Sequence, residues 1–323
     1  MIFLTGASGL LGSYICRKLV QEGNAVRAMK RKNSNLALLQ DIEAKIEWVE
    51  GDLLDILSLQ EGLKGCSKII HCAGMVSYHA KDADKLMKVN QEGTANLVNV
   101  ALQQNISTFV HISSVAAIGR SAKAGKITEN FKWSEADEHT AYGISKHLAE
   151  MEVFRGGVEG LEVVILNPAL VLAPGPWDQS SMQVFKYVNE QRPFYTRGCM
   201  NYIDARDVAN ITLLALEGAL KAGERYILSA GHISYRHFFE LAAKYLHKKA
   251  PSVQVNSYLL QAAYYFEGLR SRLMGEQPVI TKETLKLAQQ QLIFDNTKIR
   301  QTLDYQFIPL EESIRWTCQQ LKA

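Results

Sequence analysis

Residues 1–15 read MIFLTGASGLLGSYI and hold three glycines, Gly6, Gly9 and Gly12. Glycine weakens both helices and strands, so a cluster of glycines needs a geometric reason. The apolar run at 2–4 is typical of a buried strand, and apolar residues after the cluster recur at helical spacing. The glycines are therefore expected where a strand turns sharply into a helix.

The composition indicates an ordinary soluble globular protein. The chain has 323 residues, of which 47% are apolar and 21% are charged. Its 36 Lys and Arg against 33 Asp and Glu give a net charge of +3, which is too near neutral to indicate a nucleic-acid partner. No charged leader precedes an apolar segment, and no uncharged apolar run is long enough to cross a bilayer.

The cysteines indicate a reducing compartment. They are Cys16, Cys66, Cys72, Cys199 and Cys318, an odd set without metal-type spacing. Such a set is typical of reduced and mostly buried thiols. We therefore expect a cytoplasmic protein without a metal site.

The first half of the chain alternates strand-like and helix-like stretches. The strand-like runs are AVRAMKR, KIEWVEGD, SKIIHCAG, STFVHISS and EVVILNP. Helical patterns lie between some of them, at 83–104 and 141–154. Strands that alternate with helices indicate βαβ units and a parallel sheet covered on both faces. The sequence therefore predicts an α/β Rossmann fold with a doubly wound parallel sheet.

Past Pro168 this alternation ends. The turn-rich stretch LAPGPWDQ follows, and helical patterns then dominate, including those at 236–249 and 257–275. The division that we expect is a nucleotide-binding core over 1–168, to which 201–229 returns, and a smaller, mostly helical substrate lobe over 169–200 and 230–323.

A turn of this kind between strand and helix can hold the pyrophosphate of a dinucleotide. One glycine makes the tight turn, one lets the phosphates approach the backbone, and one lets the helix pack on the strand. The exposed N–H groups and the helix dipole then face the negative charge. Glycine-rich turns also occur for packing alone, but the βαβ units that follow favour cofactor binding.

The end of the second strand indicates which dinucleotide is bound. An acidic residue there binds the ribose 2′-OH of NAD, whereas an arginine accommodates the 2′-phosphate of NADP. Here the stretch carries Lys30, Arg31 and Lys32, with no carboxylate before Asp41. A solvated basic loop is the alternative, but the missing acid favours NADP. Asp52, after the third strand, is placed either to bind the adenine amino group or to cap a helix.

Tyr142 and Lys146, in YGISK, are spaced so that one face of a helix carries both. A free tyrosine has a pKa of about 10. A neighbouring ammonium favours the phenolate and brings the pKa into a range useful for acid–base catalysis. The same spacing also begins at Tyr14 and at Tyr245, but only Tyr142 follows a strand that ends in serines.

Five motifs in this order, TGASGLLG, HCAG, ISSVAAIG, YGISK and NPALVLAPG, resemble the extended short-chain dehydrogenase/reductase family. The resemblance covers nearly the whole chain. It implies that Ser114 polarises the substrate oxygen and that Tyr142 passes the proton. It also implies that Lys146 holds the ribose and lowers the tyrosine pKa, while a hydride moves to or from the nicotinamide.

The resemblance also implies which residues contact the ligands. We expect the cofactor at Gly6, Ser8, Gly9, Leu10, Leu11, Gly12, Arg31, Asp52, Leu53, Ala73, Gly74, Asn90, Tyr142, Lys146, Pro168, Leu170 and Val171. Asn90 matches a helix asparagine of the family that is often structural. The substrate is expected at Ser114, Tyr142 and Met200.

Two departures separate the chain from sugar-nucleotide epimerases, which resemble R-P-x-N-V-Y-G-P after the sixth strand. This chain has NPALVLAP, so that Asn167 replaces the arginine and Leu170 replaces the asparagine. Those enzymes also tend to carry an arginine for the substrate diphosphate where this chain has Met200. A diphosphate without that arginine loses a strong partner. Arg192 and Arg197 are alternative partners.

The pattern is closer to the dihydroflavonol-reductase-like branch, which includes relatives of 3β-hydroxysteroid dehydrogenases. It favours an oxidoreductase that reduces an apolar ketone or aldehyde, or oxidises the alcohol. A sugar-nucleotide epimerase or dehydratase and a non-catalytic NADP-binding regulator are the alternatives. The intact set of Ser114, Tyr142 and Lys146 disfavours the regulator.

Two further expectations concern the surroundings of this site. The aromatic residues Phe185, Tyr187, Phe194 and Tyr195 either line the substrate pocket or form the ordinary core of the smaller lobe. The family resemblance suggests a homodimer in which helices at 81–104 and 139–155 pack as a four-helix bundle. The contact residues would be Val89, Leu97, Val100 and Leu148.

Overall fold

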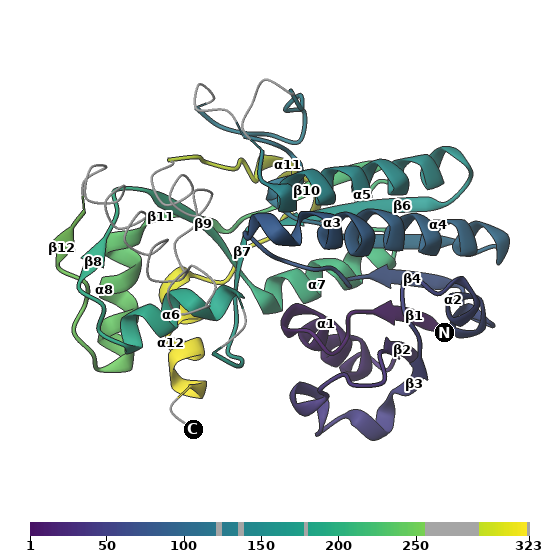
Figure 1. The fold of residues 1–323 in the computed structure, drawn as a ribbon, viewed down its shortest axis with the longest axis horizontal. Helices are drawn as coiled ribbons and strands as arrows, with labels where there is room; N and C mark the ends of the chain where they lie inside the picture. The colour runs from purple at the N-terminus through teal and green to yellow at the C-terminus, as the bar shows by residue number, and fades with distance from the viewer. Residues whose placement is uncertain (121–124, 135–138, 178–179, 256–290, 322–323) are drawn as a thin grey trace.

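A seven-stranded parallel sheet forms the centre of the computed structural model (Figure 1). The residues that the structure describes are 1–120, 125–134, 139–177, 180–255 and 291–321. The strands of the sheet are β1 (Ile2–Thr5), β2 (Val26–Lys30), β3 (Glu47–Glu50), β4 (Lys68–His71), β5 (Thr108–Ile112), β6 (Glu162–Pro168) and β10 (Glu224–Leu228). Their order, β3-β2-β1-β4-β5-β6-β10, is that of a doubly wound Rossmann sheet, which confirms the predicted fold class.

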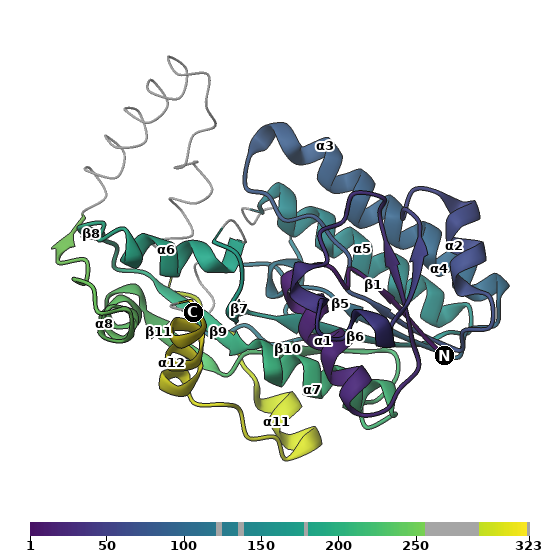
Figure 2. The same ribbon diagram turned by 90° about the horizontal axis from the view of Figure 1, so that it is seen from below.

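Two apolar layers attach helices to the two faces of this sheet (Figures 1 and 2). The helices of one face are α1 (Leu10–Gln21) and α7 (Ala205–Leu216), and those of the other are α2 (Ile56–Leu63), α4 (Gly93–Gln103) and α5 (Ala141–Val158). Successive strand residues point to opposite faces, so Leu4 packs in the first layer and Phe3 in the second. Leu97 and Val100 are fully buried in the second layer. They were therefore wrong as predicted dimer contacts, because they face the sheet of their own chain.

A smaller lobe continues from the end of β6. Its strands are β7 (Leu170–Leu172), β9 (Cys199–Asp204) and β11 (Gly231–Ser234), and its helices are α6 (Gln183–Asn189), α8 (Tyr235–Leu246) and α12 (Leu310–Gln320). The short strands β8 (Phe194–Tyr195) and β12 (Val253–Gln254) pair beside them. Phe185, Phe238 and Ile314 are buried in the core of this lobe. The helix predicted at 236–249 is α8, whereas the one predicted at 257–275 lies outside the described residues.

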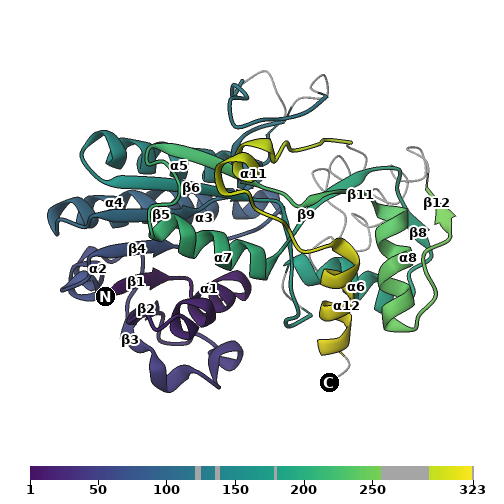
Figure 3. The same cartoon turned by 180° about the vertical axis from the view of Figure 1, so that it is seen from behind.

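The last part of the chain departs from the predicted division. The short helix α11 (Thr297–Leu303) packs against β10, and its Ile299 is buried in the layer under α1 and α7 (Figure 3). Tyr305 donates a hydrogen bond of 2.9 Å to Asp207 of α7. This segment therefore covers the large sheet, although the sequence analysis assigned all of 230–323 to the substrate lobe.

In the described ranges, no helix is long and apolar enough to span a membrane.

The turn between β1 and α1 brings three backbone segments into close contact. Gly6 has a φ of +75°, and a Cβ there would lie 2.5 Å from the backbone nitrogen of Ala73. A Cβ at Gly12 would lie 2.0 Å from the Gly6 carbonyl oxygen. Both distances are impossible for real atoms, so these two positions require glycine.

We predict that Gly12→Ala lowers the free energy of unfolding by about 1–3 kcal/mol, because overpacking forces the backbone to move. In an open helix position the same change would stabilise, since alanine is the better helix former. Urea denaturation gives the measurement. Gly125→Ala is the matched control, because nothing lies within 4 Å of a Cβ there. Equal stability of the Gly12 variant and the wild type would contradict the close contact.

Candidate active site

A pocket of about 590 Å³ lies at the carboxyl ends of β1, β4, β5 and β6, facing the smaller lobe. This edge of an open α/β sheet is where ligands usually bind. The predicted site residues that line the pocket are Gly6, Gly9, Leu10, Leu11, Gly12, Gly74, Ser114, Tyr142, Lys146, Pro168, Leu170, Val171 and Met200. Six others, Ser8, Arg31, Asp52, Leu53, Ala73 and Asn90, are not among its described lining residues.

The glycine turn between β1 and α1 fits the pyrophosphate of a dinucleotide. Gly9 is the N-cap residue of α1 and has no side chain to cap it, so the first N–H groups of this helix are open to an anion. Leu10, Leu11 and Gly12 of the first turn line the pocket. Because Gly6 and Gly12 have no side chains, the backbone of this turn packs closely.

The loop after β2 carries exposed positive charge. Arg31 and Lys32 are exposed, and the Arg31 N–H donates to the Ser34 hydroxyl at 3.0 Å. The neighbouring Lys30 ammonium lies 5.8 Å from the centre of the Trp48 ring. Asp41, the next carboxylate along the chain, is in an ion pair with an arginine of α1. The electrostatics of this loop suit a phosphate.

The loop after β3 excludes one of the two roles expected of Asp52. Asp52 does not cap a helix: its Oδ1 accepts from the Leu54 N–H at 3.0 Å within the loop. Asp55 caps α2 instead, accepting from the Leu57 N–H at 3.1 Å. The adenine contact of Asp52 stays a prediction. The side chain of Leu53 is buried under α4, so its expected contact with the cofactor stays a prediction for the backbone.

Asn90 holds the pocket wall in place. Its Oδ1 accepts from the Met75 N–H at 2.7 Å, and its Nδ2 donates to the Met75 carbonyl at 3.0 Å and to the Ser145 hydroxyl at 2.9 Å. These bonds agree with the structural role that the asparagine often has in the family, and its contact with the cofactor stays a prediction. The Ala73 N–H donates to the Thr5 hydroxyl at 3.2 Å, and the cofactor contact of Ala73 also stays a prediction.

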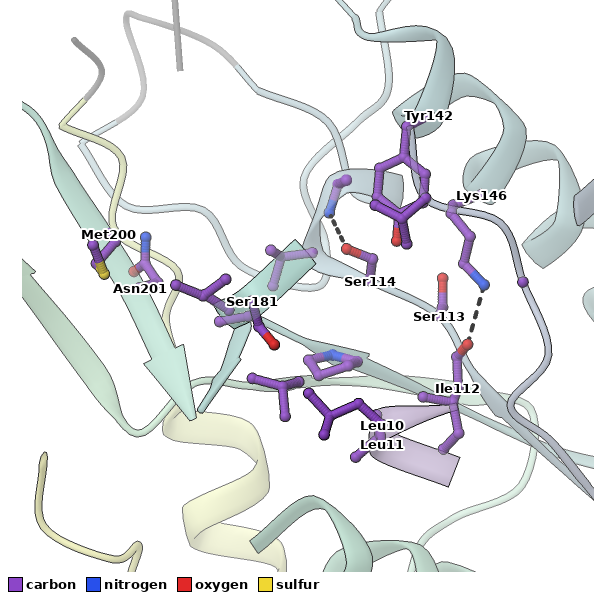
Figure 4. Close-up of a pocket in the computed structure, with 18 of the residues that line it drawn as sticks. Leu10, Leu11, Ile112, Ser113, Ser114, Tyr142, Lys146, Ser181, Met200 and Asn201 are labelled. Atoms are coloured by element: carbon purple, nitrogen blue, oxygen red, sulfur yellow. Dashed lines mark hydrogen bonds between the residues drawn. The ribbon is translucent and has the colours of Figure 1, made fainter. Parts of the chain in front are cut away.

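Tyr142, Lys146 and Ser114 all line the pocket (Figure 4). Thr140 caps α5, accepting from the Gly143 N–H at 2.9 Å, so Tyr142 lies in the first turn of the helix and Lys146 one turn later. The two side chains are only 8% and 4% exposed. Ser114 lies beside Tyr142, with its hydroxyl accepting from the Ala116 N–H at 3.2 Å, and Lys146 Nζ donates to the Ile112 carbonyl at 3.1 Å.

Burial controls the proton affinities of this pair. It raises the pKa of Tyr142 well above its usual value, although the neighbouring Ser114 hydroxyl lowers it. Burial also lowers the pKa of Lys146 to about 8. Desolvation of the phenolate is the largest of these effects on Tyr142, and the lowering of the tyrosine pKa by Lys146 stays a prediction. A phenol that stays protonated at neutral pH is suited to donate a proton.

The two other tyrosines with the same spacing lie elsewhere. Tyr14 donates to the Pro174 carbonyl at 3.1 Å, and Tyr245 to the Glu311 carboxylate at 2.5 Å. Neither is among the residues described as lining the pocket. Tyr14 shares α1 with Lys18 by coincidence of spacing, and Lys249, the partner of Tyr245 in spacing, lies beyond the end of α8.

The substrate end of the pocket is mostly apolar, with contributions from both lobes. Leu170, Val184 and Met200 line it beside Tyr235. The ring of Tyr78 meets that of Tyr142 edge to face, with 5.9 Å between ring centres. The aromatic residues predicted as possible lining, Phe185, Tyr187, Phe194 and Tyr195, belong to the lobe core or its surface.

Sequence reasoning missed one cation at this end. Arg120 lines the pocket, and Lys146 is the other charged residue of its described lining. Arg192 is paired with Glu190 at 2.9 Å, and neither it nor Arg197 is found in that lining. Arg120 comes six positions after Ser114. Its place in the pocket depends on the path of the turn between them, which sequence spacing does not predict. Across the described ranges, no cluster of His, Cys, Asp and Glu could hold a metal ion.

Sequence reasoning also missed a buried carboxylate behind the pocket. Glu150 lies one helical turn beyond Lys146 and is fully buried. It accepts hydrogen bonds from Ser113 and Asn167 and is paired with Arg225 of β10. The signal was present, because Tyr142, Lys146 and Glu150 recur at the spacing of one helix face.

Comparison with known proteins now identifies the family. The model of the NAD dependent epimerase/dehydratase family matches residues 2–229. The chain belongs to this family. It is an enzyme of the extended short-chain dehydrogenase/reductase branch, as the motifs predicted.

Two relatives and one solved structure illustrate the membership. A Synechocystis sp. protein with the provisional name dihydroflavonol 4-reductase is 32% identical over 93% of this chain and 88% of its own length. Sterol demethylase protein B of Methylococcus capsulatus is 30% identical over 80% of this chain and 78% of its own. The crystal structure of gox2253 has a TM-score of 0.84 at 29% identity, covering 100% of this chain and 98% of that one.

Proposed function

We propose that this enzyme is an NADPH-dependent reductase of an apolar ketone or aldehyde, with Tyr142 as proton donor. The observation that carries the proposal is the buried Tyr142 phenol beside Ser114 and Lys146 in a largely apolar pocket, where burial raises its pKa. Relatives named dihydroflavonol 4-reductase and cinnamoyl-CoA reductase support a carbonyl substrate. The same groups would act in reverse on the alcohol.

In the proposed reaction, the residues of the site bind the cofactor, orient the substrate or transfer the proton. The glycine turn and Lys146 would hold the dinucleotide, whose nicotinamide supplies the hydride when bound. The Ser114 hydroxyl would donate a hydrogen bond to the carbonyl oxygen of the substrate. Tyr142 would give its proton to that oxygen as negative charge develops there. The apolar wall near Met200 would exclude water and orient the substrate.

We predict that Tyr142→Phe abolishes NADPH consumption with small apolar aldehydes and ketones, while NADPH binding is nearly unchanged, because only the acid–base hydroxyl is lost. Absorbance of NADPH follows turnover, and fluorescence titration follows binding. Tyr14→Phe and Tyr245→Phe are the matched controls, since both hydroxyls bind elsewhere. Equal loss of turnover in a folded control variant would contradict the assignment of Tyr142.

A sugar-nucleotide epimerase or dehydratase is the second candidate, and Arg120 is the observation that favours it, since its charge suits a diphosphate. Against it stand Leu170 and Met200 in the pocket lining, in place of a polar group and an arginine. Calorimetry with UDP- and dTDP-sugars separates the candidates. Micromolar binding of a sugar nucleotide, without any carbonyl reduction, would falsify the reductase proposal.

The cofactor preference follows from the exposed loop after β2. We predict that NADPH binds more tightly than NADH and that Arg31→Asp narrows or reverses the difference. A charge-assisted hydrogen bond contributes about 1.5–3 kcal/mol, or roughly a tenfold to hundredfold ratio of Kd. Fluorescence titration with both cofactors measures it, and Arg192→Asp is the control for the charge change. Equal affinities in the wild type would contradict NADP preference.

We also propose a homodimer through the outward face of α5. Ile144 and Met151 are 38% and 40% exposed, and Leu148 lies between them at the spacing of one helix face. Buried apolar contact with a second copy would remove this stripe from water.

We also propose a cytoplasmic location, which the five cysteines, all free thiols, support.

The dimer predicts a solution mass of about twice the 36.1 kDa of the chain, measured by light scattering. Ile144→Asp should give the monomer mass, because it introduces a charge into the proposed contact. Leu57→Asp, at an exposed position of α2, should leave the mass unchanged. A wild-type mass near that of one chain would contradict the proposal.

A further inference from the structure

Glu150 is a charged group held entirely inside the protein. An isolated buried carboxylate costs several kcal/mol, so it persists only with strong partners. Ser113 and Asn167 both donate to its Oε1, the latter from Nδ2 at 2.5 Å. Arg225 Nη1 donates to Oε2 at 3.2 Å and is itself only 18% exposed. Three donors from β5, β6 and β10 therefore converge on one carboxylate of α5.

This network is connected to the pocket by two neighbouring serines. Ser113 lines the pocket and donates to Glu150. Asn167 uses the same Nδ2 that binds Glu150 to donate to the Ser114 carbonyl at 2.9 Å. The orientation of both serines at the end of β5 thus depends on the carboxylate behind them.

The titratable groups around Lys146 come from three elements. On α5 they are Tyr142, one turn before it, and Glu150, one turn after it. From β4 and its end, His71 has its pKa lowered to about 3 by burial, and Cys72 has its pKa raised to about 12, so both are neutral. From β5, burial likewise keeps the neighbouring His111 neutral.

Among the described residues, Glu150 is the carboxylate that acts on Lys146, from one helical turn away on α5. It raises the pKa of Lys146, against the stronger lowering by burial. Burial raises the pKa of Glu150, and the hydrogen bond from Ser113 and the charge of Arg225 on β10 oppose that rise and favour the ionised form.

We propose that Glu150 is a positioning residue of the active site: anchored by Arg225, its buried carboxylate keeps Lys146 an ammonium and fixes Ser113 and Ser114. The role of the serines and of Lys146 in turnover rests on the proposed function. The charge coupling itself does not, because it exists in the protein without ligand.

The test is the titration of Lys146 in the ligand-free protein, followed by NMR of carbon-13-labelled lysine and assigned with Lys146→Arg. The wild-type midpoint is expected near pH 8. Glu150→Gln keeps an acceptor for Ser113 and Asn167 but removes the charge. Its midpoint should fall by about one unit or more, as expected for the loss of a nearby opposite charge. Glu152→Gln, a half-buried glutamate of the same helix paired with Arg155, should leave it unchanged.

An unchanged midpoint in folded Glu150→Gln would overturn the proposal. If that variant does not fold, Arg225→Met and Arg225→Lys decide the question. The methionine variant should lower the Lys146 midpoint by destabilising the Glu150 charge, and the lysine variant should restore it. Equal midpoints in these two folded variants would equally overturn the proposal.

Activity gives an independent readout where a carbonyl substrate has been found. The alkaline limb of the kcat/KM profile should move to lower pH in Glu150→Gln and stay in place in Glu152→Gln. A uniform loss of activity with an unmoved limb would indicate a merely structural role and contradict the proposal. Failure of every carbonyl substrate in the wild type would refute the reductase and leave the NMR titration standing as the test of Glu150.

Discussion

The close contact of Gly6, Gly12 and Ala73 is the constraint on which the rest of this structure depends. It seats the first turn of α1 directly on the end of β1 and brings the loop after β4 alongside. Because β1 lies between β2 and β4 in the sheet, this contact lies at the same edge as the pocket, where the residues after the other strands gather. A backbone packed this closely leaves N–H groups, and no side chains, to meet an anion.

Burial then sets the chemistry at the same edge. Desolvation keeps the Tyr142 phenol protonated and lowers the pKa of Lys146 to about 8. Glu150 opposes the second effect from behind the pocket, so two helical turns of α5 carry an acid, a cation and its counter-charge. The polar groups of the site are thus positioned from inside the core, and the substrate meets mainly apolar walls.

The sequence predicted those features that depend on local pattern. The glycine turn, the strands of the first half and the pairing of Tyr142 with Lys146 follow from spacing along the chain, and the fold follows from them. The sequence left Asp52 open between an adenine contact and a helix cap, and only the structure shows that Asp55, three positions later, caps α2.

Features that depend on distant segments did not follow from the sequence. Arg120 and Tyr235 reach one pocket from separate lobes, and α11 returns to the large sheet with a single fully buried side chain, Ile299. The direction of the Tyr142 pKa shift was also missed, because desolvation depends on everything packed around the ring. The hydrogen bonds of Asn90 to Met75 and Ser145 likewise join segments that are far apart in the sequence.

Transfer of deuterium tests the central claim, carbonyl reduction in this pocket, most directly. The enzyme is incubated with an apolar aldehyde or ketone and with NADPH labelled at nicotinamide C4, using each labelled face in turn. The account predicts that the product alcohol carries one deuterium on the former carbonyl carbon with one of the two labels and none with the other, as mass spectrometry would show. Alcohol without deuterium from either label would contradict it.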